Sequence, residues 1–550
     1  MGYFAMYSNT SGTGNVAIGS AALDGTATTS NHTAVGHYAL GANTTGTENT
    51  SVGYASLDAN TTGSQHVGVG AYTLTANTTG TDNTAIGYAA LGQNVSGNYN
   101  TAVGRDALNK NTASNNTAVG FRSIRDNTSG ANNTALGYFA LILNTTASNN
   151  TAVGYQSLAL NTTGANNTAV GYATLDANTT AQGNSAFGYA ALSNNDTADY
   201  NSAFGLSALA TNTTGSLNAA FGVNALGSNT TGSNNTAGGV NALYSLTTPS
   251  HSTAFGYNAL TANTTGAQNT AFGSVALAAT TTGELNVAVG YAALSANTTG
   301  DNNVAIGRWA LTLNLTADNN TAVGNSALQE CTTGANNVAV GANALDACTT
   351  AASNVAIGYQ ALTANTTGDG MNVCVGKDSG DDITTGSRNV CVGTNTNPNS
   401  VAGIRQYVFG HDITGKGDNT AFIGGSNGPY NEPNNGAWST TSDQRIKKNI
   451  VNYDTGLSIV NQIQVRNFEY KTENEIKTDN PELTDVVKSA VVNKTGTQIG
   501  LIAQEVEAVL ASTVKTGSSG VKTLCTDDIF WHMLNAIKEL SAKVTALESA

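Results

Sequence analysis

A serine and a lysine near residue 445 are the side chains whose types and spacing best suit covalent chemistry. Ser442 and Lys447 lie five residues apart, with Arg445 and Lys448 beside them. A serine hydroxyl is a weak nucleophile until a base takes its proton, and a lysine amine is such a base only when its pKa is depressed. Burial and neighbouring cations both lower that pKa. Five residues is not a same-face helical spacing, so a dyad here would lie on a loop or strand, or form across subunits. The alternative is a solvated basic turn.

The chain before this point is dominated by a repeat of about seventeen residues. One unit has the form Asn-Thr-Ala-Val-Gly-Tyr-x-Ala-Leu-x-x-Asn-Thr-Thr-Gly-x-x, and its first glycine recurs from Gly19 to Gly358, with weaker copies at Gly376 and Gly393. Asn and Gly clusters mark turns around a short strand. A unit this small cannot bury its own apolar face, but stacked units can. The repeat predicts a mainly β fold, a parallel β-solenoid or β-roll with one unit per coil.

Each strand alternates between small and large side chains. Ala85 precedes Ile86, which precedes the repeat glycine, and Leu91 follows four residues after that glycine. Because successive strand residues face opposite sides, we expect the large residue to fill the core and the small one to permit close approach of a second chain. The leucines form a second apolar stack. The small face favours a three-fold bundle with the alanines near its axis; the alternative is a monomeric solenoid.

The four-residue strand core occurs far apart in the chain, as residues 16–19 and again as residues 304–307 (Val-Ala-Ile-Gly), with Asn and Thr around it. These pieces resemble the head repeats of trimeric autotransporter adhesins and repeats found in phage tail fibres. The resemblance implies a trimeric β-roll.

Composition excludes several functions. The chain has 550 residues, 10% of them charged, and 21 Lys+Arg against 35 Asp+Glu give a net charge of −14. Nucleic-acid binding needs clustered Lys and Arg, and no apolar run is long enough to cross a membrane, so we expect neither partner. No metal-ligand spacing appears, and no cofactor or metal is expected. No secretory signal peptide is visible. Gly2 lies seventeen residues before Gly19, which suggests that an upstream anchoring segment is missing.

Four of the five cysteines lie in pairs one period apart. Cys331 precedes Cys348, and Cys374 precedes Cys391. Residues one period apart stack with parallel side chains, and parallel vectors suit a disulfide poorly. We therefore expect free thiols.

Between residues 394 and 441 the repeat lapses, and prolines enter. Tyr430 and Trp438 could form a sugar-binding platform, or merely cap the apolar stack. The expected organisation is a solenoid rod over 1–393, an irregular distal cap over 394–441 and a separate domain over 442–550. In this last domain residues 465–470 read as a strand and residues 500–510 as an amphipathic helix. The chain ends in a second helix, whose apolar residues have the spacing of a coiled-coil seam: Phe530, Met533, Ile537, Leu540, Val544 and Leu547. Because the seam is short, a plain amphipathic helix is the alternative.

Three motifs in the last hundred residues form a second resemblance. They are Ser-Asp-Gln-Arg-Ile-Lys-Lys-Asn-Ile from Ser442, Gly-Leu-Ile-Ala-Gln-Glu-Val from Gly500, and Ala-Ile-Lys-Glu-Leu from Ala536. Together they are similar to the C-terminal intramolecular chaperone domain of phage tail spikes and fibres, the endosialidase type. That resemblance implies a small α+β domain that trimerises, assists folding and then cuts itself off. It implies Ser442 as nucleophile, Lys447 as general base and cleavage between Thr441 and Ser442.

These observations predict a trimeric, adhesive virion tail fibre, with a homotrimer, an upstream virion anchor and a host cell-surface receptor, such as a glycan, as partners. The predicted enzyme activity is one self-cleavage by a Ser-Lys peptidase, without turnover. A bacterial trimeric surface adhesin at the extracellular surface is the alternative. An ice-binding solenoid would need a flat Thr-x-Thr face, and an enzyme acting on a host glycan would need paired carboxylates; neither pattern stands out.

Overall fold

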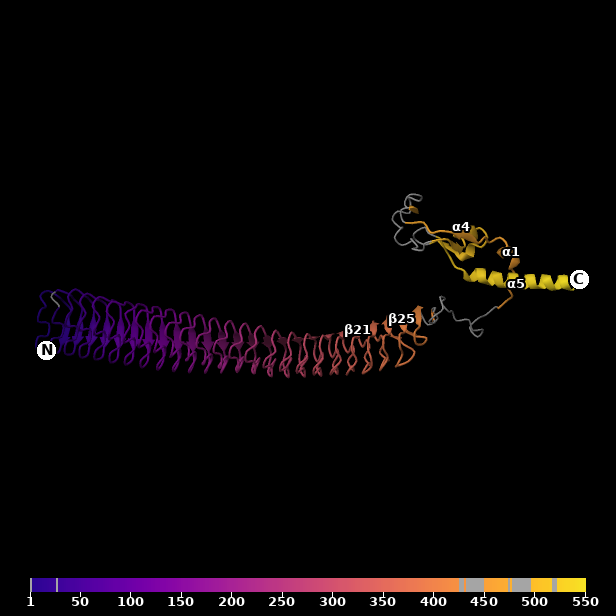
Figure 1. Ribbon diagram of the computed structural model, residues 1–550. Helices are drawn as coiled ribbons and strands as arrows, with labels where there is room; N and C mark the ends of the chain where they lie inside the picture. Colours follow the sequence, from indigo (N-terminus) through magenta and orange to yellow (C-terminus); the bar gives the residue numbers. More distant parts are fainter. Residues whose placement is uncertain are drawn as a thin grey trace. The chain divides into compact units, whose positions relative to one another are not determined.

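The chain divides into two compact units, residues 1–441 and 442–550. The computed structural model describes residues 2–25, 28–424, 430–431, 450–472, 475–476, 496–516 and 522–550. Figure 1 shows the first unit as a stack of coils that follow one another along the sequence. Within the described residues, no helix is long and apolar enough to cross a membrane.

Each coil of the first unit contributes one three-residue strand to a single sheet. Neighbouring strands are parallel and in register, so that Thr151 pairs with Thr168 and Ala152 with Ala169. This confirms the predicted parallel β-solenoid. The strands are β1 Val16–Ile18, β2 Thr33–Val35, β3 Thr50–Val52, β4 Val67–Val69, β5 Thr84–Ile86, β6 Thr101–Val103, β7 Thr117–Val119, β8 Thr134–Leu136, β9 Thr151–Val153, β10 Thr168–Val170, β11 Ser185–Phe187, β12 Ser202–Phe204, β13 Ala219–Phe221, β14 Thr236–Gly238, β15 Thr253–Phe255, β16 Thr270–Phe272, β17 Val287–Val289, β18 Val304–Ile306, β19 Thr321–Val323, β20 Val338–Val340, β21 Val355–Ile357, β22 Val373–Val375 and β23 Val390–Val392.

The chain turns after each strand through a glycine in a conformation closed to other residues. Gly137 has a φ of 146°, and a Cβ added there would lie 2.2 Å from the carbonyl oxygen of Gly154 in the next coil. Only glycine combines this φ with such a close approach. The repeat glycine is therefore a requirement of coil stacking.

In most coils, three further residues adopt left-handed backbone although they are not glycines. In one coil they are Ala89 (φ 54°), Leu91 (φ 51°) and Tyr99 (φ 57°). This conformation costs roughly 1–2 kcal/mol per residue. Each of the three donates its N–H to a carbonyl of an adjacent coil, at 3.0, 3.0 and 3.1 Å. Neighbouring coils thus offset a strain that an isolated coil would carry alone.

The two faces of each strand are the reverse of the expectation from sequence: the small side chain is buried and the large one is exposed. Ala85 is fully buried within the coil, whereas Ile86 is 40% exposed. The prediction that the large residue fills the core and the alanine faces outward was wrong. The coil is too narrow for two large side chains, and the leucine stack already fills the far side: Leu91 and its counterparts are fully buried, as predicted. Alanine is what fits between the strand and that stack.

Two ladders of asparagines lie inside the rod. Asn161 donates through Nδ2 to Asn144 Oδ1 (3.0 Å) and to the Gly164 carbonyl (3.0 Å), and Asn178 donates to Asn161 Oδ1 (2.7 Å). These side chains are fully buried. Thr162 donates its hydroxyl to the Thr179 carbonyl of the next coil (3.0 Å). The Asn-Thr-Thr triplets are therefore stacked turns that join adjacent coils.

The four repeat-borne cysteines are buried free thiols, as predicted. Cys374 pairs in register with Cys391 in the sheet, and the sulfurs of Cys331 and Cys348 lie 3.7 Å apart. The neighbouring thiol of Cys391 and burial raise the pKa of Cys374 well above its usual value.

The sheet continues past the last clear repeat. β25 Tyr407–Gly410 and β27 Ala421–Gly424 extend it in parallel, and β28 Tyr430–Asn431 adds an antiparallel end. β24 Thr396–Asn397 pairs with β26 Ile413–Thr414 to one side.

The second unit is small and mixed. It contains α1 Leu457–Val460, the antiparallel pair β29 Arg466–Phe468 and β30 Gln498–Gly500, α4 Ala503–Glu507, the 3₁₀ turn η3 Ala511–Thr513, the antiparallel pair β31 Val514–Thr516 and β32 Lys522–Leu524, and α5 Asp527–Glu548. The strand expected within 465–470 is present. The helix expected over 500–510 is shorter, because Gly500 still pairs with Arg466 in the sheet.

Candidate functional site

The residues expected to carry the chemistry lie outside the described residues. These are Thr441, Ser442, Lys447 and Trp438. Tyr430 is described through its backbone alone, which pairs with Phe422 at the end of the sheet. The dyad and the sugar-binding platform therefore stay predictions.

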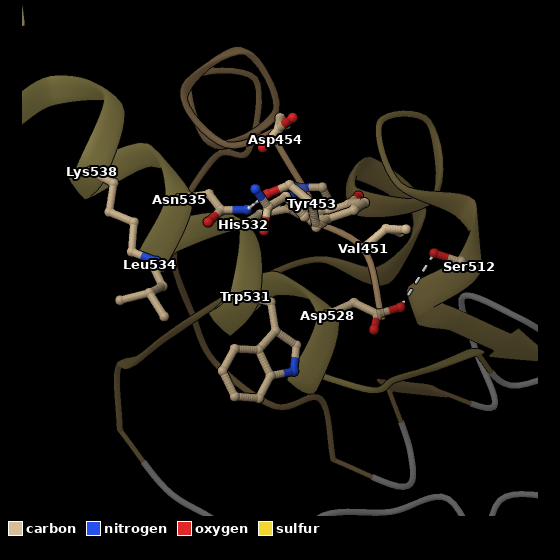
Figure 2. Close-up of a pocket in the computed structure, with 11 residues that line it drawn as sticks. Val451, Tyr453, Asp454, Ser512, Asp528, Trp531, His532, Leu534, Asn535 and Lys538 are labelled. Carbon is tan, nitrogen blue, oxygen red and sulfur yellow. Dashed lines mark hydrogen bonds between the residues drawn. The ribbon is translucent and has the colours of Figure 1, made fainter. Parts of the chain in front are cut away.

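A pocket of about 880 Å³ begins nine residues after Ser442. Two segments form most of its wall: residues 451–454, which precede α1, and one side of α5 from Asp528 to Lys538, with Ser512 of η3 at one edge. Figure 2 shows the side chains of Tyr453 and His532 next to each other at the back of this pocket.

His532 joins the two walls. Its Nδ1 lies 3.0 Å from the Thr455 carbonyl, and its Nε2 lies 3.0 Å from the Tyr453 hydroxyl. Because a carbonyl oxygen only accepts, Nδ1 carries the proton and donates to it; in the neutral ring Nε2 then accepts from the tyrosine O–H. The imidazole is 3% exposed. Asn535, one turn further along α5, donates to the Tyr453 carbonyl.

The pocket holds the residue types of a serine-hydrolase triad but not its arrangement. Ser512 donates to Asp528 (3.4 Å), so the carboxylate bonds the serine rather than the histidine. Both nitrogens of His532 are occupied by Tyr453 and Thr455. Figure 2 shows Asp528 directed toward Ser512 and away from His532. A triad needs the histidine between the other two groups, so these side chains fasten α5 to the unit.

The backbone of α5 also packs closely on the start of α1. A Cβ added at Gly456 would lie 2.3 Å from the Ala536 nitrogen, so only glycine fits there. The Leu457 N–H donates to the Glu539 carboxylate (3.3 Å). Ile529, His532 and Ala536 are the buried residues of α5.

A stripe of large apolar side chains on α5 is exposed. The six seam residues identified from the sequence are 46–79% exposed, and Trp531 is 55% exposed. An apolar surface of this extent on one helix is typical of a site that another chain covers. The seam predicted from the sequence is therefore present on α5 and exposed in the single chain.

Ion pairs fix α4 to its neighbouring strands. Arg466 of β29 bonds both oxygens of Glu505, at 3.1 and 3.0 Å, and Lys522 of β32 bonds Glu507 at 2.6 Å. Val506 between them is buried. Within the described residues, no group of three or more His, Cys, Asp or Glu side chains could hold a metal ion.

Residues 442–515 match the family model Peptidase_S74, chaperone of endosialidase. The C-terminal region thus carries a chaperone-of-endosialidase domain, and the match begins at the residue where the second structural unit begins. No curated protein matches the chain. No solved structure matches it.

Sequence reasoning missed the contacts of Tyr453 and His532. A signal was present, because Ile529, His532 and Ala536 recur at helical spacing beside the seam. A second stripe of this kind marks the side of a helix that packs on its own chain.

Proposed function

We propose that the protein is a trimeric, tail-spike-like fibre of a bacteriophage virion, whose C-terminal domain aligns and folds three chains and is then cut off. The observation that carries the proposal is the match of residues 442–515 to the chaperone of endosialidase, directly after a self-similar β-solenoid.

The outer face of the sheet supports association of the rod. Of the strands β1 to β23, all but β14 end in an outward Val, Ile, Leu or Phe, and none contains a charged residue. The exposed fractions in this column reach 53% at Ile18, 48% at Leu136 and 45% at Phe221, so the outer face of the sheet is an apolar strip that runs along the rod. Monomeric proteins rarely expose so much. A trimer through this face places the Val, Ile and Phe column, rather than the alanines, at the axis.

The backbone of the rod supports the need for a folding helper. Each coil carries left-handed residues whose N–H groups bond to adjacent coils, so the first coil to form gains the fewest of these bonds for the same backbone cost. Neighbouring coils are also alike, which leaves the register of three chains weakly specified. A domain that trimerises first supplies a nucleus for folding and starts the three chains in the same register. The exposed seam of α5 suits that trimerisation.

The proposed cut releases this domain once the rod has formed. Lys447 takes the proton of the Ser442 hydroxyl, whose oxygen attacks the carbonyl carbon of Thr441. The Thr441–Ser442 C–N bond breaks as the Ser442 nitrogen takes that proton from Lys447, which leaves an ester between the two residues. Water then hydrolyses the ester, leaving a carboxylate on Thr441, and the hydroxyl and a free amine on Ser442. The rod stays assembled because its unfolding barrier is high.

Denaturing gels and N-terminal sequencing of the purified full chain test the cut. We expect a released piece of about a fifth of the chain that starts at Ser442. Ser442→Ala and Lys447→Ala should each leave the chain whole while trimers still form, and Lys448→Ala, which alters the adjacent cation, should still cleave. Cleavage at the same bond in Ser442→Ala would contradict the dyad.

The remaining parts of the proposal concern attachment. The distal region with Tyr430 and Trp438 would contact a host receptor, such as a glycan, and a segment upstream of the repeats would anchor the fibre to the virion. A bacterial surface adhesin with the same rod is the alternative; mass spectrometry of purified virions against cell-surface fractions distinguishes the two.

A further inference from the structure

The outward column of the sheet is interrupted by a block of larger side chains near its middle. Phenylalanine ends five strands of β1 to β23, namely β11, β12, β13, β15 and β16, and Gly238 ends β14 between them. Elsewhere in these strands the position is Val, Ile or Leu. Reading by coil from β10 to β17, the order is Val, Phe, Phe, Phe, Gly, Phe, Phe, Val.

The rings of the block are ordered along the rod. Phe187 and Phe204 stack with centroids 4.8 Å apart, Phe204 and Phe221 at 5.2 Å, and Phe255 and Phe272 at 5.2 Å. Gly238 interrupts the stack between Phe221 and Phe255, and a Cβ added there would lie 2.4 Å from Cδ1 of Phe255. The ring of Phe255 therefore leans over the glycine, and the block has a defined notch.

We propose that this phenylalanine block with its notch at Gly238 keeps three chains in register along the outward column. The inference rests on the trimer proposed above, and the occupant of the face is a further copy of the same chain. The absence of charge from the strand face and the extent of the apolar column both match a partner with an identical column.

Aligned chains and chains offset by one coil differ in which side chains of the outward column lie at the same position along the rod. In most of the rod an offset replaces a valine by a valine or isoleucine and changes little. Across the block, an offset of one coil mismatches four levels: Val170 against Phe187, Phe221 against Gly238, Gly238 against Phe255, and Phe272 against Val289. An unbroken block would mismatch only its two ends. Each mismatch overpacks or leaves a void, and overpacking alone typically costs about 1–3 kcal/mol.

The block thus acts where the C-terminal domain cannot. The C-terminal domain aligns the three chains at one end of the rod. Further along, one chain could skip a coil, and because the coils are nearly identical the remaining coils would then pair with a register shift of one coil. The block stops such an offset from passing into β1 to β10.

Distances between spin labels on the full-length chain test this. One label per chain is placed at exposed Thr45→Cys, on the N-terminal side of the block, in a Cys525→Ser background where the other cysteines are buried. A second labelled chain carries Thr299→Cys, between the block and the C-terminal domain. Each is compared with a variant in which all five phenylalanines become valine, the residue that most other coils already carry.

With the native block we expect trimers by sedimentation and a narrow distance distribution at both labels. In the five-valine variant the Thr45 distribution should broaden by multiples of the ~4.8 Å coil spacing, while the Thr299 distribution stays narrow. Trimers with narrow distributions at both labels in the variant would overturn the register role alone, as would a broad distribution at Thr45 in the native chain. Monomers of the native chain would overturn the trimer as well.

Discussion

In the rod, each coil is bonded to the coil before it and the coil after it, whereas the C-terminal unit holds itself together at a few points. The rod buries long stacks of alanine, leucine and asparagine, most of them at 0% exposure. Among the described residues of the C-terminal unit, the buried hydrophobic ones are Val506, Ile529 and Ala536. One region has many weakly distinguishable contacts along its length, and the other has few contacts of its own and a large exposed apolar helix.

This difference bears on two separate steps, which are the start of rod assembly and the persistence of the assembled rod. A stack of like units is stabilised by neighbour contacts, so it is hard to begin and hard to undo once formed. In the proposed function, the small unit with its exposed helical seam is the part that begins association, because covering the seam would bury its apolar side chains. Four experiments on single coils or on α5 sharpen this contrast.

Truncating a stacked leucine should have the largest effect. Leu158 is fully buried in the rod and Leu160, in the same coil, is 47% exposed. Leu158→Ala should lower the free energy of unfolding by about 2–5 kcal/mol, because it removes buried surface and leaves a cavity. Leu160→Ala should change it by less than about 0.5 kcal/mol. Hydrogen exchange of peptides from this coil measures both, and equal effects would contradict the assigned core.

Breaking one asparagine ladder should come next. Asn161→Ala leaves Asn144 Oδ1 and an amide proton of Asn178 without their partner, whereas the Gly164 carbonyl still accepts from Asn150 Nδ2 (3.0 Å). Unsatisfied buried polar groups cost roughly 1–3 kcal/mol each, so we expect a loss of about 2–3 kcal/mol after relaxation. Thr163→Ala, at an exposed position in the same turn, is the control. No change in thermal stability for Asn161→Ala would show that the ladder is dispensable.

Loosening α5 should affect the C-terminal unit alone. His532→Ala removes the bonds to Tyr453 and Thr455, with an expected cost of about 1–3 kcal/mol. Peptides covering 450–460 should exchange about ten-fold faster per 1.4 kcal/mol lost, while rod peptides stay unchanged. Lys538→Ala, at the pocket wall, serves as the comparison. Faster exchange in the rod as well would mean that the two regions are not independent.

Acid should weaken the N-terminal coils selectively. Burial lowers the pKa of His66, whose Nδ1 accepts from the Asn83 N–H (3.2 Å) in place of an asparagine oxygen. The unfolded state then binds the proton more readily, so stability is full above the ordinary pKa of about 6.5 and falls as pH drops below it. We expect lower protection factors near residue 66 at pH 5 than at pH 7.5, after correction for the slower intrinsic exchange of amides in acid, and we expect His66→Asn to abolish the difference. Equal acid sensitivity in the His66→Asn variant would show that protonation of His66 is not the cause.

The sequence predicted the solenoid because its period is explicit in the spacing of glycines such as Gly87 and Gly104. It did not predict which strand face is buried. The interior width that selects Ala85 over Ile86 depends on the opposite leucine stack, which is a property of the closed coil rather than of alternation. In the C-terminal unit the seam of α5 was predictable from periodicity. The contact of His532 with Tyr453 joins residues 79 positions apart, and no local pattern encodes that pairing.

The central claim, that the C-terminal domain is needed to form the rod but not to keep it, is tested most directly by comparing two samples of residues 1–441. One is released from the full-length chain by cleavage at Thr441–Ser442, or by an inserted protease site there when the chain is not cut. The other is expressed alone. Sedimentation and thermal melting should show uniform, stable trimers for the released rod, and aggregates or mis-registered species for the rod expressed alone. Uniform trimers of equal stability from both samples would contradict the claim.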